Sequence, residues 1–307
     1  MARRRTGQCA TETRTGHGME AQAKVMTPAL YVVATPLGNL GDITLRALEV
    51  LRGADVIACE DTRHTRRLLE HYDIRATLFA VHEHNEAAAA EKLLALLALG
   101  KSVALVSDAG TPAVSDPGAR AVAAVRGAGY PVIPLPGANA AIAALSASGI
   151  NDPHFLFYGF LPTKPGTRRA AIERLKPVAA ALVFYEAPHR ISETLADLAE
   201  LLEPARELVI ARELTKLFEQ IARMPLIEGP AWLAGDDNRR RGEFVLIVSA
   251  PPPEEDLPPA ALATLKLLLA ELPLKQAVRL AGEISGASRN SLYQRALAWK
   301  SELPETL

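Results

Sequence analysis

The sequence has very little cysteine. Its 307 residues include only two, Cys9 and Cys59, which is too few for the disulfide framework of a small secreted fold. Cys59 ends the apolar run 56–59, where a small buried hydrophobic side chain is expected. We therefore predict a chain that folds around its own apolar core in a reducing, cytoplasmic compartment.

Long apolar runs are also lacking. None reaches the roughly 18 residues that a membrane-spanning helix needs, so we predict no association with a membrane. The N-terminal segment begins with Arg3, Arg4 and Arg5 but has no apolar stretch of the kind that a signal peptide contains. Because it is rich in threonine, glycine and charge, we predict a disordered extension over residues 1–28.

Motifs of several common enzyme classes are missing as well. The chain has no G-x-G-x-x-G or Walker A loop, which argues against a dinucleotide or ATP enzyme. It has no G-x-S-x-G, which argues against a serine hydrolase. The formal net charge of −1 argues against a uniformly basic surface for nucleic acid, although local basic patches remain compatible with it.

The sequence does contain an alternation of apolar runs, Gly/Pro loops and helical segments. In the first half we predict strands at residues 30–35, 56–59, 103–107 and 132–135, with helices at 44–51, 86–99, 119–126 and 140–147. In the second half we predict strands at residues 155–158, 181–185, 207–211 and 244–248, and a helix at 191–202. Short continuous apolar runs of this kind are typical of buried parallel strands.

This pattern predicts an α/β fold with two α/β domains, residues 29–147 and 148–250, and a ligand cleft between them. A proline-rich polar linker at 251–256 leads to a helical tail at 257–307. Within that tail, residues 274–293 have helix-turn-helix spacing. Such helix pairs are also common as packing hairpins, so contact between the tail and nucleic acid stays open.

Three loops of small residues follow predicted strand ends, at residues 36–38, 108–112 and 136–138. In open α/β sheets ligands bind outside the carboxyl ends of the strands, and small residues let the backbone approach them closely. Any one of these loops alone is compatible with an ordinary turn, since glycine and proline are frequent in turns. Three of them in one domain favour a binding site.

A polar cluster at residues 60–65 follows the second predicted strand and is compatible with a functional site. It is equally compatible with a solvated helix start that Asp61 or Thr62 caps. His82 and His84 follow the next apolar run and, on a strand, would point the same way, as in half of a metal site. No partner pair of cysteine or histidine occurs at ligand spacing elsewhere, so we predict no metal.

Basic side chains cluster near strand ends at two places. The first cluster is Lys164, Arg168 and Arg169, and the second is Arg239, Arg240 and Arg241. Clusters in these positions could hold a polyanion, although basic clusters more often belong to a solvated surface.

Taken together, the loops resemble the RsmI family of 16S rRNA ribose-2′-O-methyltransferases. The resemblance lies in long, ungapped motifs that follow one another in order from about residue 29 to the end of the chain. These motifs occupy residues 34–40, 60–65, 106–112, 115–118, 159–162, 184–186, 211–216 and 241–243.

The resemblance implies the tetrapyrrole-methylase fold, S-adenosylmethionine in the cleft, and a homodimer. It implies methylation of the ribose 2′-hydroxyl of a decoding-centre cytidine, cytidine 1402, in the 16S rRNA of the 30S subunit. By motif it places the cofactor against Pro36, Gly38, Asp108, Ala109, Gly110, Thr111, Gly137, Ala138 and Asn139, with Phe160, Leu161, Tyr185 and Glu186 as walls from the second domain. The two basic clusters are then the predicted contacts with rRNA.

Methyl transfer to a hydroxyl requires positioning and a group that accepts the hydroxyl proton. Among the carboxylates at strand ends we favour Asp61, oriented and kept ionised by Arg63, and we place Glu60 second. His82 and His84 are the other candidates in this domain. If Asp61 is only a helix cap, it stabilises the fold and has no part in the chemistry.

Two other functions stay open. The first is a precorrin-type methyltransferase of the same fold, which the helical tail and the cluster at 60–65 argue against. The second is a non-catalytic RNA-binding assembly protein, which the complete set of cofactor loops argues against.

Overall fold

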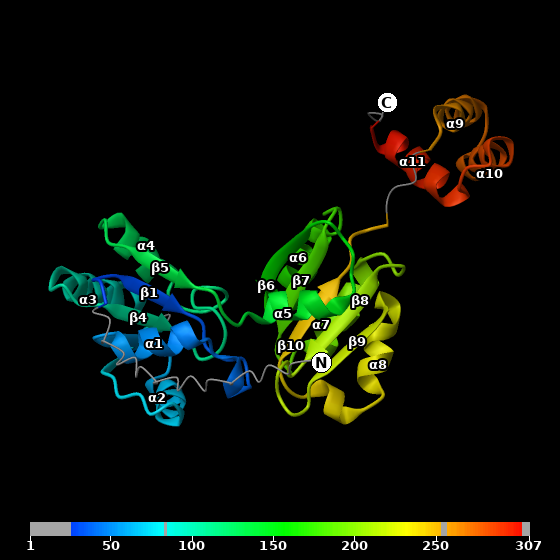
Figure 1. Cartoon of the computed structure of the whole chain (residues 1–307). Helices are drawn as coiled ribbons and strands as arrows, with labels where there is room; N and C mark the ends of the chain where they lie inside the picture. The colour runs from blue at the N-terminus through cyan, green and yellow to red at the C-terminus, as the bar shows by residue number, and fades with distance from the viewer. Residues whose placement is uncertain (1–25, 83–84, 253–256, 303–307) are drawn as a thin grey trace, which may run out of the picture.

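The computed structural model describes residues 26–82, 85–252 and 257–302, which form two α/β domains and a helical module (Figure 1). The α/β class and the C-terminal helices predicted from the sequence are confirmed. Most of the predicted disordered extension lies outside the described residues. Its predicted end at residue 28 is wrong, because Met26 packs against Gly53 and the Thr27 carbonyl accepts a 3.1 Å hydrogen bond from the Tyr31 hydroxyl.

The first domain has a parallel five-stranded sheet with the strand order β3-β2-β4-β1-β5. Its strands are β1 (Leu30–Val33), β2 (Val56–Cys59), β3 (Leu78–Ala80), β4 (Val103–Val106) and β5 (Val132–Leu135). Burial on both faces explains their continuous apolar runs. Because all five strands are parallel, their carboxyl ends meet at one edge of the sheet, and the loops that follow β1, β2, β4 and β5 leave from that edge.

Helices cover both faces of this sheet (Figure 1). On one face α1 (Leu45–Gly53) and α2 (Thr62–His71) pack their apolar sides against alternate strand residues, including Tyr31 and Val33. On the other face α3 (Glu86–Ala98) and α4 (Ala119–Gly127) pack against the intervening residues, including Leu30. A short 3-10 helix, η1 (Leu40–Asp42), lies between β1 and α1.

The second domain has a mixed five-stranded sheet with the order β6-β7-β10-β8-β9. Its strands are β6 (Phe155–Phe160), β7 (Ala181–Glu186), β8 (Glu207–Arg212), β9 (Gln220–Pro225) and β10 (Phe244–Val248). β6 runs parallel to β7, and the other neighbours pair antiparallel. One face of the sheet packs against α6 (Pro165–Leu175), α7 (Ile191–Leu201) and α8 (Gly229–Ala234).

The helix α5 (Ala140–Ser148) covers the opposite face of the second sheet. Its Ala141 and Ala144 belong to the same buried cluster as Val183 and Val245. The predicted domain boundary after residue 147 is therefore wrong, because α5 packs with the second domain. The chain crosses between the domains in the segment between β5 and α5.

A buried ion-pair network joins α6 to α7. The side chain of Arg168 is 3% exposed, and its Nε donates to Asp197 Oδ2 at 2.6 Å. A terminal nitrogen of the same guanidinium donates to Glu193 at 3.1 Å. Arg169 pairs with Asp197 and Glu200. The prediction that Arg168 contacts RNA is wrong, because its charge is buried and neutralised inside the fold. Arg169 is already bound by two carboxylates, which compete with any phosphate for its guanidinium group.

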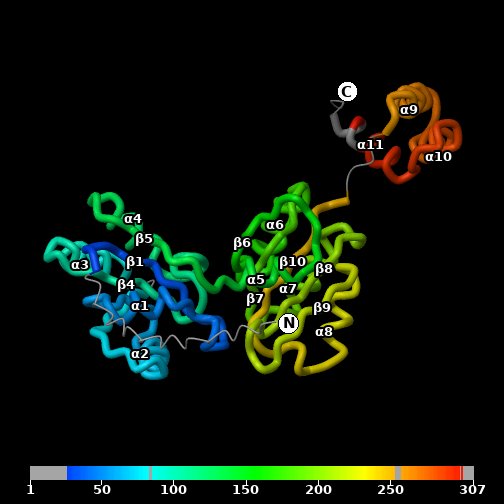
Figure 2. The backbone as a smooth tube through the Cα atoms, viewed as in Figure 1, coloured from blue at the N-terminus to red at the C-terminus, as the bar shows by residue number. Residues whose placement is uncertain are grey.

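The helical module consists of α9 (Pro259–Glu271), α10 (Leu274–Ser285) and α11 (Arg289–Glu302). Leu265, Ala281 and Leu292 are fully buried in its own small core. Gly286, with φ of 70°, ends α10 in the left-handed conformation, so a short turn joins α10 to α11 as the sequence predicts. Figure 2 follows the chain from β10 through this module. No helix in the described ranges has both the length and the apolar character needed to cross a bilayer.

From the ion-pair network around Arg168 we predict that its carboxylate partners differ in their contribution to stability. Asp197→Ala removes the best-placed partner of a buried guanidinium, and we expect it to lower the free energy of unfolding by about 3 kcal/mol. Glu200→Ala is the matched control, because it removes only an exposed partner of Arg169 and should have little effect. Urea denaturation monitored by circular dichroism measures both, and equal effects of the two substitutions would contradict the assignment.

Candidate functional site

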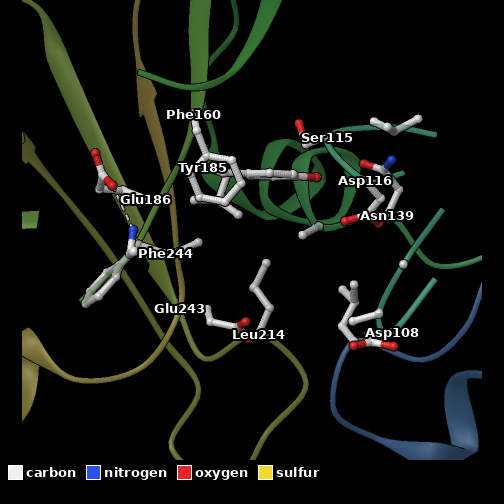
Figure 3. Close-up of a pocket in the computed structure, with 18 of the residues that line it drawn as sticks. Asp108, Ser115, Asp116, Asn139, Phe160, Tyr185, Glu186, Leu214, Glu243 and Phe244 are labelled. Carbon is white, nitrogen blue, oxygen red and sulfur yellow. Dashed lines mark hydrogen bonds between the residues drawn. The ribbon is translucent and has the colours of Figure 1, made fainter. Parts of the chain in front are cut away.

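A pocket of about 460 Å³ lies between the two α/β domains (Figure 3). From the first domain it is lined by the loops that follow β1, β2, β4 and β5. From the second domain it is lined by the ends of β6, β7 and β8 and the start of β10. Both halves of the chain therefore contribute to one site, at the edge of the first sheet where ligands are expected.

Hydrogen bonds between loops bring the first-domain wall together. Thr35 and Gly110 exchange two backbone hydrogen bonds of 2.9 Å, which join the loops after β1 and β4. Gly110 has a φ of 78°, which a glycine adopts without strain. The Thr111 hydroxyl donates to the Ala138 carbonyl at 2.9 Å and adds the loop after β5. The three predicted small-residue loops thus form one continuous surface.

Three carboxylates gather on this surface. Asp108 Oδ1 accepts a 3.1 Å hydrogen bond from the backbone N–H of Asp61, which draws the loop after β2 towards the loop after β4. Burial and the negative charge of Asp108 raise the pKa of Glu60. Burial and the nearby Glu60 raise the pKa of Asp116 to about 6. Both pKa values are raised by burial and by neighbouring carboxylates, and a cluster of acidic groups of this kind suits a positively charged ligand.

The segment that carries Asp116 is held in a strained conformation. Ala113 and Ser115 have φ angles of 66° and 60°, which non-glycine residues rarely adopt. At its end the Gly118 N–H donates to the buried carboxylate of Glu86 at 2.7 Å. Strain of this kind persists where surrounding contacts determine the conformation, and it is common in ligand-binding loops.

Aromatic rings form the facing wall from the second domain. The rings of Phe160 and Tyr185 pack edge to face with centroids 5.7 Å apart. The Tyr185 hydroxyl accepts a hydrogen bond of 3.2 Å from the N–H of Ala141, which fixes the ring beside α5. Figure 3 shows these rings on the side of the second domain and Asp108 and Asp116 on the side of the first. The pocket therefore has an acidic wall and an aromatic wall.

Glu186, at the end of β7, differs from the other acidic groups of the pocket. Its side chain is buried, and it accepts a hydrogen bond of 2.6 Å from Thr194 and one of 2.8 Å from the N–H of Ala187. Arg190 lies 3.4 Å away as a counter-charge. The charge of Glu186 is thus already compensated within the second domain.

Lys216 is the cation of the pocket, and two carboxylates hold it. Its Nζ lies 2.9 Å from Glu213 and 2.6 Å from Glu243. The aliphatic part of its side chain lies directly over Gly38, where a Cβ atom would come within 2.3 Å of it. A glycine is therefore required in the loop after β1 because a side chain of the second domain covers it.

Asp61 lies at the start of α2 and is not among the residues that line the pocket. Its carboxylate caps the helix by accepting a hydrogen bond of 2.8 Å from the N–H of Arg63, and it binds the Arg63 guanidinium at 2.7 and 3.2 Å. The hydrogen bonds from Arg63 hold the pKa of Asp61 far below its usual range. The predicted pairing with Arg63 is present, and it holds the Asp61 carboxylate at the start of α2, outside the lining of the pocket.

Most of the predicted cofactor contacts lie together in the pocket, and some do not. Those that line it are Asp108, Ala109, Gly110, Thr111, Asn139, Phe160, Tyr185 and Glu186. Those that are not among the lining residues are Pro36, Gly38, Gly137, Ala138 and Leu161. Gly137 packs against Ala34, and Leu161 is buried in the core of the second domain. These residues shape the backbone of the site without facing the cavity.

Several lining residues were not predicted as site residues, among them Leu37, Ser115, Asp116, His189, Leu214, Lys216 and Glu243. Six of them lie within motifs that carry the family resemblance, at residues 34–40, 115–118, 211–216 and 241–243, but the sequence analysis gave these residues no role in the site. Of the two histidines considered for a metal, His84 lies outside the described residues. Within the described part of the chain no three histidine, cysteine or acidic side chains are grouped as metal ligands would be.

The chain matches two known families. Residues 29–228 match the family described as tetrapyrrole (corrin/porphyrin) methylases, and residues 255–300 match the RsmI C-terminal HTH domain. The ribosomal RNA small subunit methyltransferase I of Escherichia coli O157:H7 is 54% identical over 269 residues, which cover 87% of this chain and 94% of that protein. The protein of the same name from Vibrio cholerae is 52% identical and covers 88% of this chain and 94% of its own length.

Solved structures support the fold at lower sequence identity. A cobalt precorrin-4 methyltransferase has a TM-score of 0.55 at 15% identity, covering 72% of this chain and 94% of that chain. A uroporphyrin-III C-methyl transferase from Thermus thermophilus, solved with S-adenyl homocysteine, has a TM-score of 0.50 at 20% identity, covering 72% and 97%. Family matches along most of the chain and relatives at about half identity lead to one conclusion: the chain belongs to the tetrapyrrole methylases, in the RsmI family.

Proposed function

We propose that the protein transfers a methyl group from S-adenosylmethionine to the ribose 2′-hydroxyl of cytidine 1402 in 16S rRNA. The observation that carries the proposal is the interdomain pocket, with its acidic wall and its aromatic wall. It occurs in a chain about half identical to proteins named ribosomal RNA small subunit methyltransferase I. The choice of the 2′-oxygen of this decoding-centre cytidine rests on the family resemblance.

The residues of the pocket fit the proposed cofactor. Phe160, Tyr185 and Leu37 offer apolar and aromatic surface for a purine ring. Glu60, Asp108 and Asp116 offer negative charge to a ligand that carries a sulfonium and an ammonium group. Bound there, the cofactor supplies an electrophilic methyl group. The chain's own contribution is to hold both reactants in line and to exclude water between the two domains.

We infer that Glu60 accepts the hydroxyl proton, in place of Asp61. Glu60 lines the pocket, whereas Asp61 does not. Its pKa is raised by burial and by Asp108, so it is a stronger base than an ordinary glutamate when it is ionised. Asp61 and Arg63 are then positioning residues, which fix the backbone that carries Glu60.

A tetrapyrrole or precorrin substrate is the competing proposal, because the structural neighbours act on such molecules by their names. Those neighbours are 15–24% identical, which supports a common fold only. The relatives named for rRNA match nearly the whole chain, including the helical module. We therefore favour rRNA in the small subunit, in the cytoplasm where ribosomes assemble, as the substrate.

A homodimer is also proposed from the resemblance. Ile142, Phe155 and Tyr158 are exposed apolar residues at the start of the second domain. A second copy of the chain would cover these apolar side chains.

The function is tested with 30S subunits from a strain that lacks this chain's homologue. The protein and methyl-labelled cofactor should place one label per subunit, and mapping should find it on the 2′-oxygen of the proposed cytidine. Precorrins should receive no label. A protein that binds cofactor by calorimetry but labels precorrins, or labels the rRNA at another site, would contradict the proposal.

The proton acceptor is tested by paired substitutions. Glu60→Gln should lower the single-turnover rate of methylation by about 100- to 10,000-fold, because the amide cannot accept the proton. Asp61→Asn should stay close to the wild-type rate, because asparagine caps the helix about as well as aspartate. Asp61→Asn should keep its cofactor affinity, and measuring both rates at saturating cofactor separates the loss of the base in Glu60→Gln from any loss of cofactor affinity. The opposite order of the two rates would restore Asp61 as the base.

Because of the acidic wall, we expect the stability of the protein to depend on pH. Folded Asp116 keeps its proton up to a pKa of about 6, whereas its ordinary pKa is 3.8, so the wild-type fold loses stability as the pH rises between these values. Asp116→Asn removes this loss. Relative to the wild type it should be about 1–3 kcal/mol more stable at pH 8, with that gain absent at pH 4.

Urea denaturation across this pH range measures the difference. Asp237→Asn is the control for loss of an aspartate elsewhere, because Asp237 is exposed in η4 (Asp237–Arg240) and is not among the lining residues of the pocket. A pH-independent difference for Asp116→Asn would show that its carboxylate is not destabilised in the folded protein.

A further inference from the structure

The segment between β8 and β9 exposes an apolar tip. Leu217 is 90% exposed and Phe218 is 67% exposed. Both follow directly after Lys216, which lines the pocket together with Leu214. This apolar pair therefore directly follows a residue that lines the proposed active site.

The tip is held in place by a strained and well-bonded loop. Glu213 and Thr215 have φ angles of 52° and 66°, in the left-handed region that favours glycine. The N–H of Thr215 donates to Glu219 at 2.6 Å, and the Thr215 hydroxyl accepts from the N–H of Asn39 in the first domain at 3.2 Å. Residues adopt such a conformation when their surroundings require it. The loop therefore presents Leu217 and Phe218 to solvent in a fixed way.

Cationic side chains flank the tip on the side of the second domain. Arg240 and Arg241 are exposed, and Arg212 donates to the Arg241 carbonyl at 3.2 Å, which keeps this segment against the end of β8. Glu243, two residues beyond Arg241, binds Lys216. The second basic cluster predicted from the sequence thus adjoins the apolar tip.

The first domain contributes cations on the other side. Arg66 and Arg67 are exposed on α2, which begins beside Glu60 of the pocket. The far end of α2 is joined to η1 by the hydrogen bond from the Tyr72 hydroxyl to the Leu40 carbonyl, and Asn39 of that loop contacts Thr215. In the described part of the chain, Arg66 and Arg67 form no ion pair with a carboxylate. Their charges are available to an external anion.

We propose that the ring of Phe218 is a stacking platform for an unpaired RNA base beside the methylated nucleotide, with Leu217 extending its apolar surface, while Arg66, Arg67 and Arg241 contact the phosphates. This inference rests on the proposed function, because it names how the rRNA is held at that site. Single-stranded RNA is recognised by aromatic side chains that stack on bases and by cations along the backbone. The tip and its flanks have this composition, and an RNA strand crossing between the domains would meet both.

The test uses the full-length protein and 30S subunits that lack the methyl group. Phe218→Ser should raise KM for the subunits about 5- to 100-fold, because base stacking on an aromatic ring is lost. Phe218→Trp should keep the wild-type KM, and Phe218→Leu should behave like Phe218→Ser. The cofactor Kd and the melting temperature should stay unchanged in all three, since the side chain is exposed.

Leu99→Ser is the matched control. Leu99 is 76% exposed, but it follows α3 at the edge of the first sheet opposite to the pocket, so its substitution should leave KM unchanged. If wild type methylates the subunits and Phe218→Ser keeps the wild-type KM, the platform is refuted. Retention of the wild-type KM by Phe218→Leu would also refute it, because apolar docking against a ribosomal protein needs no aromatic ring. Failure of the wild type to methylate the subunits would refute the proposed function itself.

Discussion

The two backbone hydrogen bonds between Thr35 and Gly110 hold together the loops after β1 and β4, and the pocket depends on this bridge. From Gly110 the contacts spread through Thr111 to the loop after β5 and through Asp108 to the loop after β2. Four loops that are far apart in the sequence thereby become one wall. The consequence is electrostatic, because these contacts bring Glu60 and Asp116 close to Asp108, and burial together with the neighbouring carboxylates raises the pKa of Glu60 and that of Asp116.

On the opposite wall, the charged side chains are compensated by partners within the second domain. Glu186 is compensated by Thr194 and Arg190, and Lys216 is held by Glu213 and Glu243. Uncompensated negative charge therefore remains only on the first-domain side of the described pocket. Such an asymmetry gives a cationic ligand one orientation between the two walls, and it leaves the aromatic surface of Tyr185 for the apolar part of that ligand.

Much of this fold could be predicted from the sequence, because buried parallel strands are continuous apolar runs bounded by glycine and proline. β9 was missed, since Gln220–Pro225 alternates exposed and half-buried residues at a sheet edge and has no such run. The helix α5 was placed in the wrong domain because its composition, largely alanine, shows no preferred face. Packing against the second sheet, which the sequence does not display, decides where it belongs.

Site residues were predicted where they lie in the small-residue loops directly after strand ends. They were missed where only the folded chain brings the side chain to its partners. The loop 108–111 follows a strand end and lines the pocket, as predicted. Lys216 reaches the pocket from more than a hundred residues away, and only the fold shows that it covers Gly38. Arg168 was misjudged for the same reason, since its carboxylate partners lie on a different helix. Asp61 was recognised as a partner of Arg63, but the sequence could not show that the neighbouring Glu60 faces the cavity.

The acidic wall of the pocket is placed to receive the positive charge of the cofactor. Calorimetric titration with S-adenosylmethionine at pH 6, in two buffers of different ionisation enthalpy, counts the protons exchanged on binding. A cation that settles beside Glu60 and Asp116 lowers their pKa values, so the account predicts proton release, and less of it for S-adenosylhomocysteine, which lacks the sulfonium charge. Equal binding enthalpies in the two buffers at pH 6 would contradict the account, because the carboxylates would then not sense the ligand.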